Sequence, residues 1–268
     1  MDHILFAAQH QGQREYQEDS WHFASPVQDT DGPFMIICDG MGGHTGGKQA
    51  SRGVLNSFTD HFRKHADMLI NQRLKESLTH AHQGLLTQIE NDPNLSGMGT
   101  TLLAVYIQQN DLSWISVGDS PLFLIRDGQI QRLNEDHSMV PVLEKMREDD
   151  VISQEDLDTD PRRNMLRSAV SDDDIKHIDQ QHHSNFLRSG DILLLATDGL
   201  ETLSSDILCH QVTKNRQAGA KKLARHLIQA TLAAEKPNQD NVTVISYIHN
   251  PVPQLVKSWG DRLRNLFR

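Results

Sequence analysis

The chain has 268 residues, with 36 acidic and 26 basic side chains and a formal charge of −10. This balance excludes nucleic acid as the main partner and disfavours an anionic membrane surface, because both attract basic proteins. The two cysteines, Cys38 and Cys209, are too few for a disulfide scaffold, so we expect reduced thiols in a cytoplasmic protein.

The first part of the chain alternates short apolar segments with longer amphipathic ones. Residues 3–10 and 33–40 have the length and composition of strands, and the second of them runs into a cluster of glycines. Apolar residues recur every four positions over 46–65, and a similar apolar face runs along 73–91. Both of these longer segments are therefore predicted to be helices.

The apolar period changes after residue 100. Residues 100–133 have the pattern of four strands separated by turn residues, and Asp127-Gly128 is a strong hairpin signal between two apolar runs. We expect four consecutive hairpin-linked strands. Such strands indicate antiparallel sheet and not a doubly wound parallel sheet.

The remaining segments complete the pattern. Residues 135–180 are polar, and we interpret the acidic run at 148–160 as a solvated helix and loop. Three regular elements are predicted after it: an apolar strand within 191–202 that ends at Asp198-Gly199, a helix over 218–234 and a strand over 239–248. Helices that cover antiparallel strands indicate an α+β layer architecture.

Residues 1–250 are predicted to form one domain, and residues 251–268 a separate tail. The apolar residues of the tail fall on one helical face, and its charged residues are mostly basic, which is typical of an amphipathic basic helix. This face consists of Leu255, Trp259, Leu263 and Leu266. Two interpretations stay open: the helix packs on the domain's own surface, or it docks to a partner or a membrane.

Acidic residues stand beside the ends of several predicted strands. Asp39, Asp198 and Asp240 adjoin apolar runs, and the further acidic positions are Glu18, Asp19 and Asp119. Each one alone is explained by a turn or a helix cap. Together they would repel one another, and a divalent cation with oxygen ligands would remove that cost. The joint pattern therefore predicts a site for Mg²⁺ or Mn²⁺.

Six short motifs follow one another along the chain. They are Arg14-Glu15-Tyr16-Gln17-Glu18-Asp19, Asp-Gly-Met-Gly-Gly-His at 39–44, Gly-Thr-Thr at 99–101, Gly-Asp-Ser at 118–120, Thr-Asp-Gly at 197–199 and Asp-Asn at 240–241. In this order and spacing, residues 3–248 resemble the metal-dependent Ser/Thr protein phosphatase 2C family in its compact bacterial form. The resemblance implies a four-layer α-β-β-α sandwich, with two antiparallel sheets flanked by helices.

The resemblance also implies roles for individual residues. The implied ligands of two Mn²⁺ or Mg²⁺ ions are Asp39 as the bridge, Asp198 and Asp240 at the first ion, and the Gly40 carbonyl, Glu18 and Asp19 at or near the second. Asp119 would help to hold a third, weaker ion. Arg14 would contact the substrate phosphate, a task that suits a planar guanidinium with its paired hydrogen bonds.

The implied activity is hydrolysis of phosphoserine and phosphothreonine in proteins by a water that two metal ions activate. We expect a monomer that acts on phosphorylated protein substrates and opposes a Ser/Thr kinase. The alternative is a non-catalytic regulator of the same fold that binds phosphoproteins. No run approaches about 18 consecutive apolar residues and no signal peptide is evident, so no integral membrane segment is expected.

Two positions beside Asp39 bear on catalysis. Animal members of the family have a histidine directly after the Asp-Gly pair, where this chain has Met41, so His44 becomes the candidate acid for the leaving group. Loop packing, a hydrogen bond to a ligand carboxylate, or proton donation by metal-bound water are the alternatives for His44. Cys38 lies inside an apolar strand, so we expect an inert core thiol and not a nucleophile.

Overall fold

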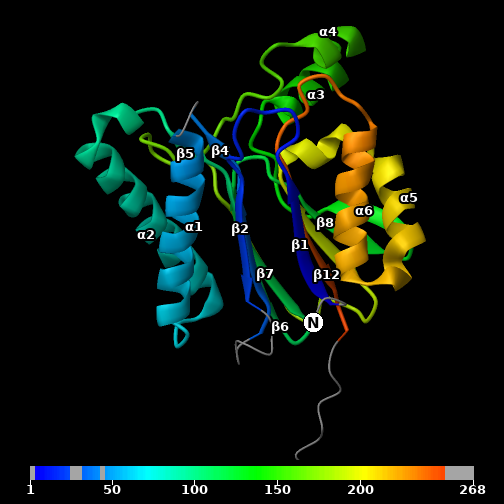
Figure 1. Ribbon diagram of the computed structural model, residues 1–268, viewed down its shortest axis with the longest axis horizontal. Helices are drawn as coiled ribbons and strands as arrows, with labels where there is room; N and C mark the ends of the chain where they lie inside the picture. The colour runs from blue at the N-terminus through cyan, green and yellow to red at the C-terminus, as the bar shows by residue number, and fades with distance from the viewer. Residues whose placement is uncertain (1–3, 25–31, 43–45, 251–268) are drawn as a thin grey trace, which may run out of the picture.

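Two five-stranded antiparallel sheets lie face to face in the computed structural model, which describes residues 4–24, 32–42 and 46–250 (Figure 1). The first sheet has the order β1 (Leu5–His10), β12 (Val242–Ile248), β11 (Ile192–Ala196), β8 (Leu122–Arg126) and β9 (Gln129–Arg132). The second has the order β10 (Asp179–His183), β7 (Asp111–Val117), β6 (Leu102–Gln108), β3 (Phe34–Cys38) and β2 (Ser20–Ala24). A short pair, β4 (Gly40–Met41) and β5 (Gly99–Thr100), lies beyond the second sheet.

Helices cover the outer face of each sheet (Figure 1). The second sheet carries α1 (Gly46–Lys64) and α2 (Ile70–Asn91), and the first carries α5 (Ser205–Asn215) and α6 (Ala220–Ala233). Two shorter helices, α3 (Val140–Glu148) and α4 (Gln154–Thr159), stand together at one end of the sandwich. Single-turn 3₁₀ segments lie at Pro93–Leu95, Asp198–Thr202 and Arg216–Ala218.

Successive side chains of the buried strands face alternately the helices and the other sheet, and this produces the four layers. In β3, Phe34, Ile36 and Cys38 pack against the helices, whereas Met35 and Ile37 pack against the other sheet. The strand β11 repeats this division between its two faces. Side chains of a strand point alternately to its two faces, so a continuously apolar strand must be covered on both sides. The predicted α-β-β-α sandwich is confirmed.

Most of the predicted elements are present, and one connection was predicted wrongly. The strands β7 and β8 do not form a hairpin, because β7 belongs to the second sheet and β8 to the first. The segment from Gly118 to Pro121 therefore crosses between the two sheets, and Gly118 has a φ of 100°, which glycine adopts without strain. The strands β2, β4, β5 and β10 and the helices α3 and α5 were not predicted.

The acidic run at 148–160 forms a turn followed by α4, as interpreted from its composition. The helix starts with a capping box, in which Ser153 and Asp156 exchange side-chain and backbone hydrogen bonds. Within the described ranges, no helix is long and apolar enough to cross a membrane. The tail over 251–268 lies outside the described residues.

The strand directions bring the predicted acidic positions to one end of the sandwich. The pairs Ser20↔Cys38 and Ala196↔Val244 place the start of β2 beside the end of β3, and the end of β11 near the start of β12. The residues that adjoin these strand ends include Asp39, Asp198 and Asp240. Both sheets therefore contribute acidic side chains to the same end.

Candidate metal and phosphate site

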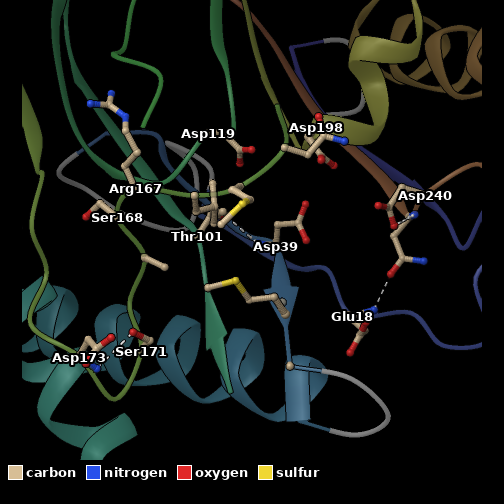
Figure 2. Close-up of a pocket in the computed structure, with 18 of the residues that line it drawn as sticks. Glu18, Asp39, Thr101, Asp119, Arg167, Ser168, Ser171, Asp173, Asp198 and Asp240 are labelled. Carbon is tan, nitrogen blue, oxygen red and sulfur yellow. Dashed lines mark hydrogen bonds between the residues drawn. The ribbon is translucent and has the colours of Figure 1, made fainter. Parts of the chain in front are cut away.

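A cavity of about 630 Å³ opens at this end of the sandwich. Six of the seven predicted metal-binding residues line it: Glu18, Asp39, Gly40, Asp119, Asp198 and Asp240. Asp19 is absent from the lining, and its buried carboxylate faces the polar ends of β11 and β12. Figure 2 shows Asp39, Asp119 and Asp198 directed toward one central space.

The backbone of Asp39 is held on both sides. Its N–H donates to the Thr101 hydroxyl at 2.9 Å, and its carbonyl accepts from the Thr100 hydroxyl at 2.7 Å and from the Thr101 N–H at 2.8 Å. These bonds fix the chain where it leaves β3 and turn the carboxylate toward the cavity (Figure 2). Burial raises the pKa of Asp39 well above its ordinary value, and Asp19 and Asp198 add to that shift by repulsion.

Asp19 is anchored through one oxygen only. Its Oδ2 accepts hydrogen bonds from the hydroxyls of Thr197 at 3.1 Å and Thr243 at 2.6 Å, while Oδ1 is buried without a partner. Burial raises its pKa to about 7, although the two threonine hydrogen bonds act in the opposite direction. The free oxygen leaves one ligand position on a fixed carboxylate.

Asp198 and Asp119, which adjoin strands of the first sheet, also have raised carboxyl pKa values. Burial raises the pKa of Asp198 to about 6, and repulsion from Asp240 adds to the shift. Burial and then repulsion from Asp198 raise the pKa of Asp119 to about 8. A hydrogen bond of 2.6 Å from the Arg132 guanidinium to the Asp119 carbonyl holds the crossing segment in place.

Glu18 approaches the cavity from the loop before β2. Its backbone N–H donates to the Asn241 side chain at 2.7 Å, which ties this loop to the start of β12 (Figure 2). Its Oε1 is buried without a hydrogen-bond partner, and burial raises the pKa of its carboxyl. Glu18 therefore presents an unused oxygen, as Asp19 does.

Arg14 lies at the rim of the cavity and is engaged by one of the predicted ligands. Its guanidinium donates a hydrogen bond of 2.5 Å to the Asp240 carboxylate. The Arg14 side chain is 52% exposed and that of Asp240 37%, so solvent reaches this ion pair. The predicted phosphate-binding residue is thus beside the carboxylates, at a place where an entering phosphate would meet it.

The donor set fits hard divalent cations. Three carboxylate oxygens, on Glu18, Asp19 and Asp198, are buried without a hydrogen-bond partner, and leaving such groups unpaired is costly. Mg²⁺ and Mn²⁺ prefer carboxylate and carbonyl oxygens. Among the described residues, no three acidic, histidine or cysteine side chains are arranged tightly enough to enclose an ion. The fit therefore rests on the unpaired oxygens and the raised carboxyl pKa values.

Gly40 is required by the packing around the site. A Cβ at this position would collide with the carbonyl of Gly47 and lie against that of Glu18. Only glycine allows α1 and the loop before β2 to approach this closely, and the approach keeps Glu18 at the cavity. Gly40 therefore serves close packing beside Asp39.

Sequence reasoning assigned no metal ligand and no phosphate contact to the opposite wall of the cavity. This wall is formed by the segment 164–176, which contributes Arg167, Ser168, Asp173 and Asp174 among others (Figure 2). Its backbone is tied to β5 through Val170 and Thr100, and to α2 through a 2.9 Å hydrogen bond between His82 and the Ser171 carbonyl. The part of this segment within 162–171 resembles the family's segment beside the bacterial flap, and that resemblance was the signal in the sequence that linked it to the site.

Two predictions about neighbours of Asp39 have different outcomes. Cys38 is fully buried and burial raises its thiol pKa far above the ordinary value, so the prediction of an inert core residue is confirmed. Met41 lines the cavity, where its thioether offers no proton. His44 lies outside the described residues, and its role stays a prediction.

The chain has relatives among known phosphatases. The sequence model of the family described as "Protein phosphatase 2C" matches residues 7–239. The chain is 29% identical over 220 residues to "Serine/threonine phosphatase stp" of Listeria monocytogenes, covering 80% of this chain and 83% of that protein.

Solved structures share the fold. The crystal structure of the Mycobacterium tuberculosis serine/threonine phosphatase PstP/Ppp superposes with a TM-score of 0.75 at 26% identity, covering 92% of this chain and 98% of that one. The catalytic domain of PstP in complex with two manganese ions gives a TM-score of 0.73 at 25% identity, with the same coverage. The chain belongs to the protein phosphatase 2C family.

Proposed function

We propose that the protein is a metal-dependent phosphoprotein phosphatase that hydrolyses the phosphate esters of phosphoserine and phosphothreonine. The observation that carries this proposal is the set of carboxylates at one cavity, two of which, Glu18 and Asp198, have buried unpaired oxygens, with Arg14 at the rim. An arginine beside a cluster of unpaired carboxylates suits a substrate that brings a dianionic phosphate to bound cations.

The residues that would hold two Mn²⁺ or Mg²⁺ ions are Glu18, Asp19, Asp39, Asp198, Asp240 and the carbonyl of Gly40, with Asp119 toward a third. When bound, such ions lower the pKa of water and neutralise charge on a transferring phosphoryl group. The unpaired oxygens of Glu18, Asp19 and Asp198 support this assignment.

The chain's own groups have separate tasks around these ligands. Arg14 binds and orients the phosphate through its guanidinium fork, and this requires it to exchange Asp240 for the substrate. Thr100 and Thr101 hold Asp39 in position through its backbone. His44 is the candidate to protonate the leaving serine or threonine oxygen, because Met41 has no proton to give.

The test is hydrolysis of phosphoserine, phosphothreonine and phosphotyrosine peptides with Mn²⁺, with Mg²⁺ and with a chelator. We expect release of phosphate from the first two peptides only when a metal is present. Absence of hydrolysis in saturating Mn²⁺, together with retained binding of the phosphopeptides, would favour the alternative of a non-catalytic regulator. The intact set of carboxylates argues against that alternative.

The setting of this activity is also inferred. We infer a monomer in the cytoplasm whose substrates are phosphorylated by an opposing Ser/Thr kinase, and the two free cysteines agree with a reducing compartment. We further infer that residues 1–250 are the catalytic domain and that 251–268 act separately. Deletion of 251–268 should leave peptide hydrolysis unchanged, and fractionation of cells that express the deletion would report any loss of docking.

A further inference from the structure

A second, smaller cavity of about 170 Å³ is built from three elements that contribute nothing to the carboxylate site. Its walls are the turn between β8 and β9, the loop that precedes β11, and the end of α5 with the residue that follows it. Three arginines line it: Arg126, Arg188 and Arg216. In a chain of charge −10, this gathering of arginines is unexpected from composition.

The cavity lies at the opposite end of the first sheet from the carboxylates. Asp119 precedes β8 and Asp198 follows β11, whereas Asp127 and Asp191 lie at the other ends of these same strands. A five-residue strand is about 16 Å long at about 3.3 Å per residue. A ligand of this cavity therefore cannot contact the metal-binding carboxylates with the same group.

One of the arginines and one of the acids neutralise each other. Arg126 donates from Nε to Asp191 at 2.9 Å and from its terminal nitrogen at 2.6 Å, and it also donates to the Phe186 carbonyl at 2.7 Å. The backbone N–H of Arg188 donates to the same Asp191 carboxylate at 2.7 Å. This network fixes the loop before β11, from which Arg188 extends into the lining of the cavity.

The other two arginines remain available. Arg188 and Arg216 are exposed, and among the described residues neither guanidinium forms a hydrogen bond or an ion pair. The hydroxyl-bearing residues Ser189 and Thr213 line the same cavity. Asp127 also belongs to the lining, so three arginines stand against two aspartates, a net charge of +1.

We propose that this cavity binds a phosphate group, either on a phosphorylated side chain of a protein or as free phosphate. Guanidinium forks match the oxygens of a tetrahedral phosphate, and paired hydrogen bonds to it are strong. The volume of about 170 Å³ corresponds to roughly six waters at about 30 Å³ each, which suits one phosphate group and no larger ligand. The proposal goes beyond the phosphatase activity and does not depend on it.

The experiment uses the full chain loaded with Mg²⁺, labelled with ¹⁵N, and two probes. The probes are inorganic phosphate and a peptide that carries a non-hydrolysable phosphonate analogue of phosphothreonine. We expect saturable shifts of the amide signals of Ser189, Gly190 and Thr213, separate from any shifts at Gly40 and Met41. In the double variant R188A/R216A, the dissociation constant obtained from the Ser189, Gly190 and Thr213 signals should rise by about tenfold or more, because two charge-assisted contacts are lost.

The matched control is the double variant R52A/R147A, which removes the same charge from exposed positions outside the cavity. It should bind both probes within about twofold of the parent, since only long-range electrostatics change. Arg216 also follows the last residue of α5, where a cation stabilises a helix end, so the unfolding temperature of each variant is compared.

Shifts at Ser189, Gly190 and Thr213 with the phosphonate peptide support a phosphoprotein ligand, and shifts with inorganic phosphate alone support a site for free phosphate. The proposal is overturned if neither probe moves these signals. It is equally overturned if R52A/R147A weakens binding as much as R188A/R216A does.

Discussion

Arg14 and Asp240, which lie 226 positions apart in the chain, form a hydrogen-bonded ion pair at the rim of the carboxylate cavity. The two residues were predicted to contact different partners, the substrate phosphate and a metal ion. Their pairing means that Arg14 competes with a cation for the Asp240 carboxylate. Phosphate binding and metal binding are therefore expected to be coupled through this pair.

Replacing Arg14 with alanine should weaken binding of the substrate phosphate without weakening binding of Mn²⁺. Mn²⁺ should bind equally or up to about fivefold more tightly, because an exposed ion pair contributes at most about 1 kcal/mol. The KM for a phosphothreonine peptide should rise by about tenfold or more, since the guanidinium contact with phosphate is lost. Calorimetric titration of Mn²⁺ and steady-state kinetics measure the two effects. Weaker Mn²⁺ binding by R14A would contradict the coupling, and R14K serves as the charge-preserving control.

Replacing Asp39 with asparagine should abolish hydrolysis and preserve the fold. We expect a loss of about 10³-fold or more, because the central ligand loses its charge. The raised pKa of Asp39 shows that its ionised form is destabilised by burial and neighbouring carboxylates. In chelator, D39N should therefore unfold at the same or a higher temperature than the parent, as followed by circular dichroism. The control is D173N, an exposed position on the opposite wall. Full activity of D39N would contradict the role of Asp39 as the central metal ligand.

The stability of the metal-free protein should fall as pH rises from about 4 to about 8. Burial raises the pKa of Asp198 to about 6, of Asp19 to about 7 and of Asp119 to about 8, each from an ordinary value of 3.8. An acid whose folded pKa is raised contributes stability below its unfolded pKa, and this contribution is lost as pH rises through the folded pKa.

Thermal unfolding in chelator across this pH range measures that effect. Added Mn²⁺ should reverse the trend, because deprotonated carboxylates bind the ion more tightly and binding stabilises the folded state. A pH profile that is the same with and without Mn²⁺ would contradict this account of the carboxylates.

Replacing Gly40 with alanine should destabilise the protein by about 1–3 kcal/mol, which is typical of overpacking in a filled site. The new Cβ would collide with the Gly47 carbonyl, so α1 or the loop before β2 has to move. Denaturant unfolding measures the loss of stability. The matched control is G46A, whose Cβ would lie in ordinary contact with the Met98 side chain. Equal stability of the two variants would show that the close approach at Gly40 can relax.

Replacing His44 with glutamine tests the source of the leaving-group proton. If His44 is the acid, kcat for a phosphothreonine peptide should fall by about 10²–10⁴-fold. An aryl phosphate has a more acidic leaving group that departs without a proton, so its hydrolysis should change little. The comparison of the two substrates measures this difference directly. An equal loss for both would assign His44 to loop packing or ligand orientation.

The buried part of the fold could be predicted from the sequence because its strands are apolar on both faces. The strands β3, β11 and β12 were found for this reason. The strands β2 and β10 lie at the two edges of their sheet, where β10 is polar and β2 mixes polar with apolar residues, so neither has that signal. The connection at Gly118 has the local chemistry of a hairpin turn, and only the packing of two sheets decides that it crosses between them.

The site was predictable where acidic residues adjoin apolar strands, and not elsewhere. Asp39, Asp198 and Asp240 stand out against their neighbours in the sequence, as do the further acidic positions Glu18, Asp19 and Asp119. The family resemblance added Arg14 and the Gly40 carbonyl. The threonines that anchor Asp19, Thr197 and Thr243, are ordinary strand residues until the sheets bring them together. The wall over 164–176 has no periodicity, so its position depends on long-range contacts that a local pattern does not contain.

The carboxylates adjoin strands of both sheets, so we expect ion selectivity to depend on how the two sheets pack. Asp39 follows β3 of the second sheet, and Asp198 follows β11 of the first. Asp119 lies on the segment that connects the two sheets. Side chains between the sheets, such as Ile37 and Leu195, set the spacing of the layers and with it the separation of these oxygens. Substitutions in this core, at residues that are not themselves predicted ligands, should therefore shift the preferred ionic radius among divalent cations.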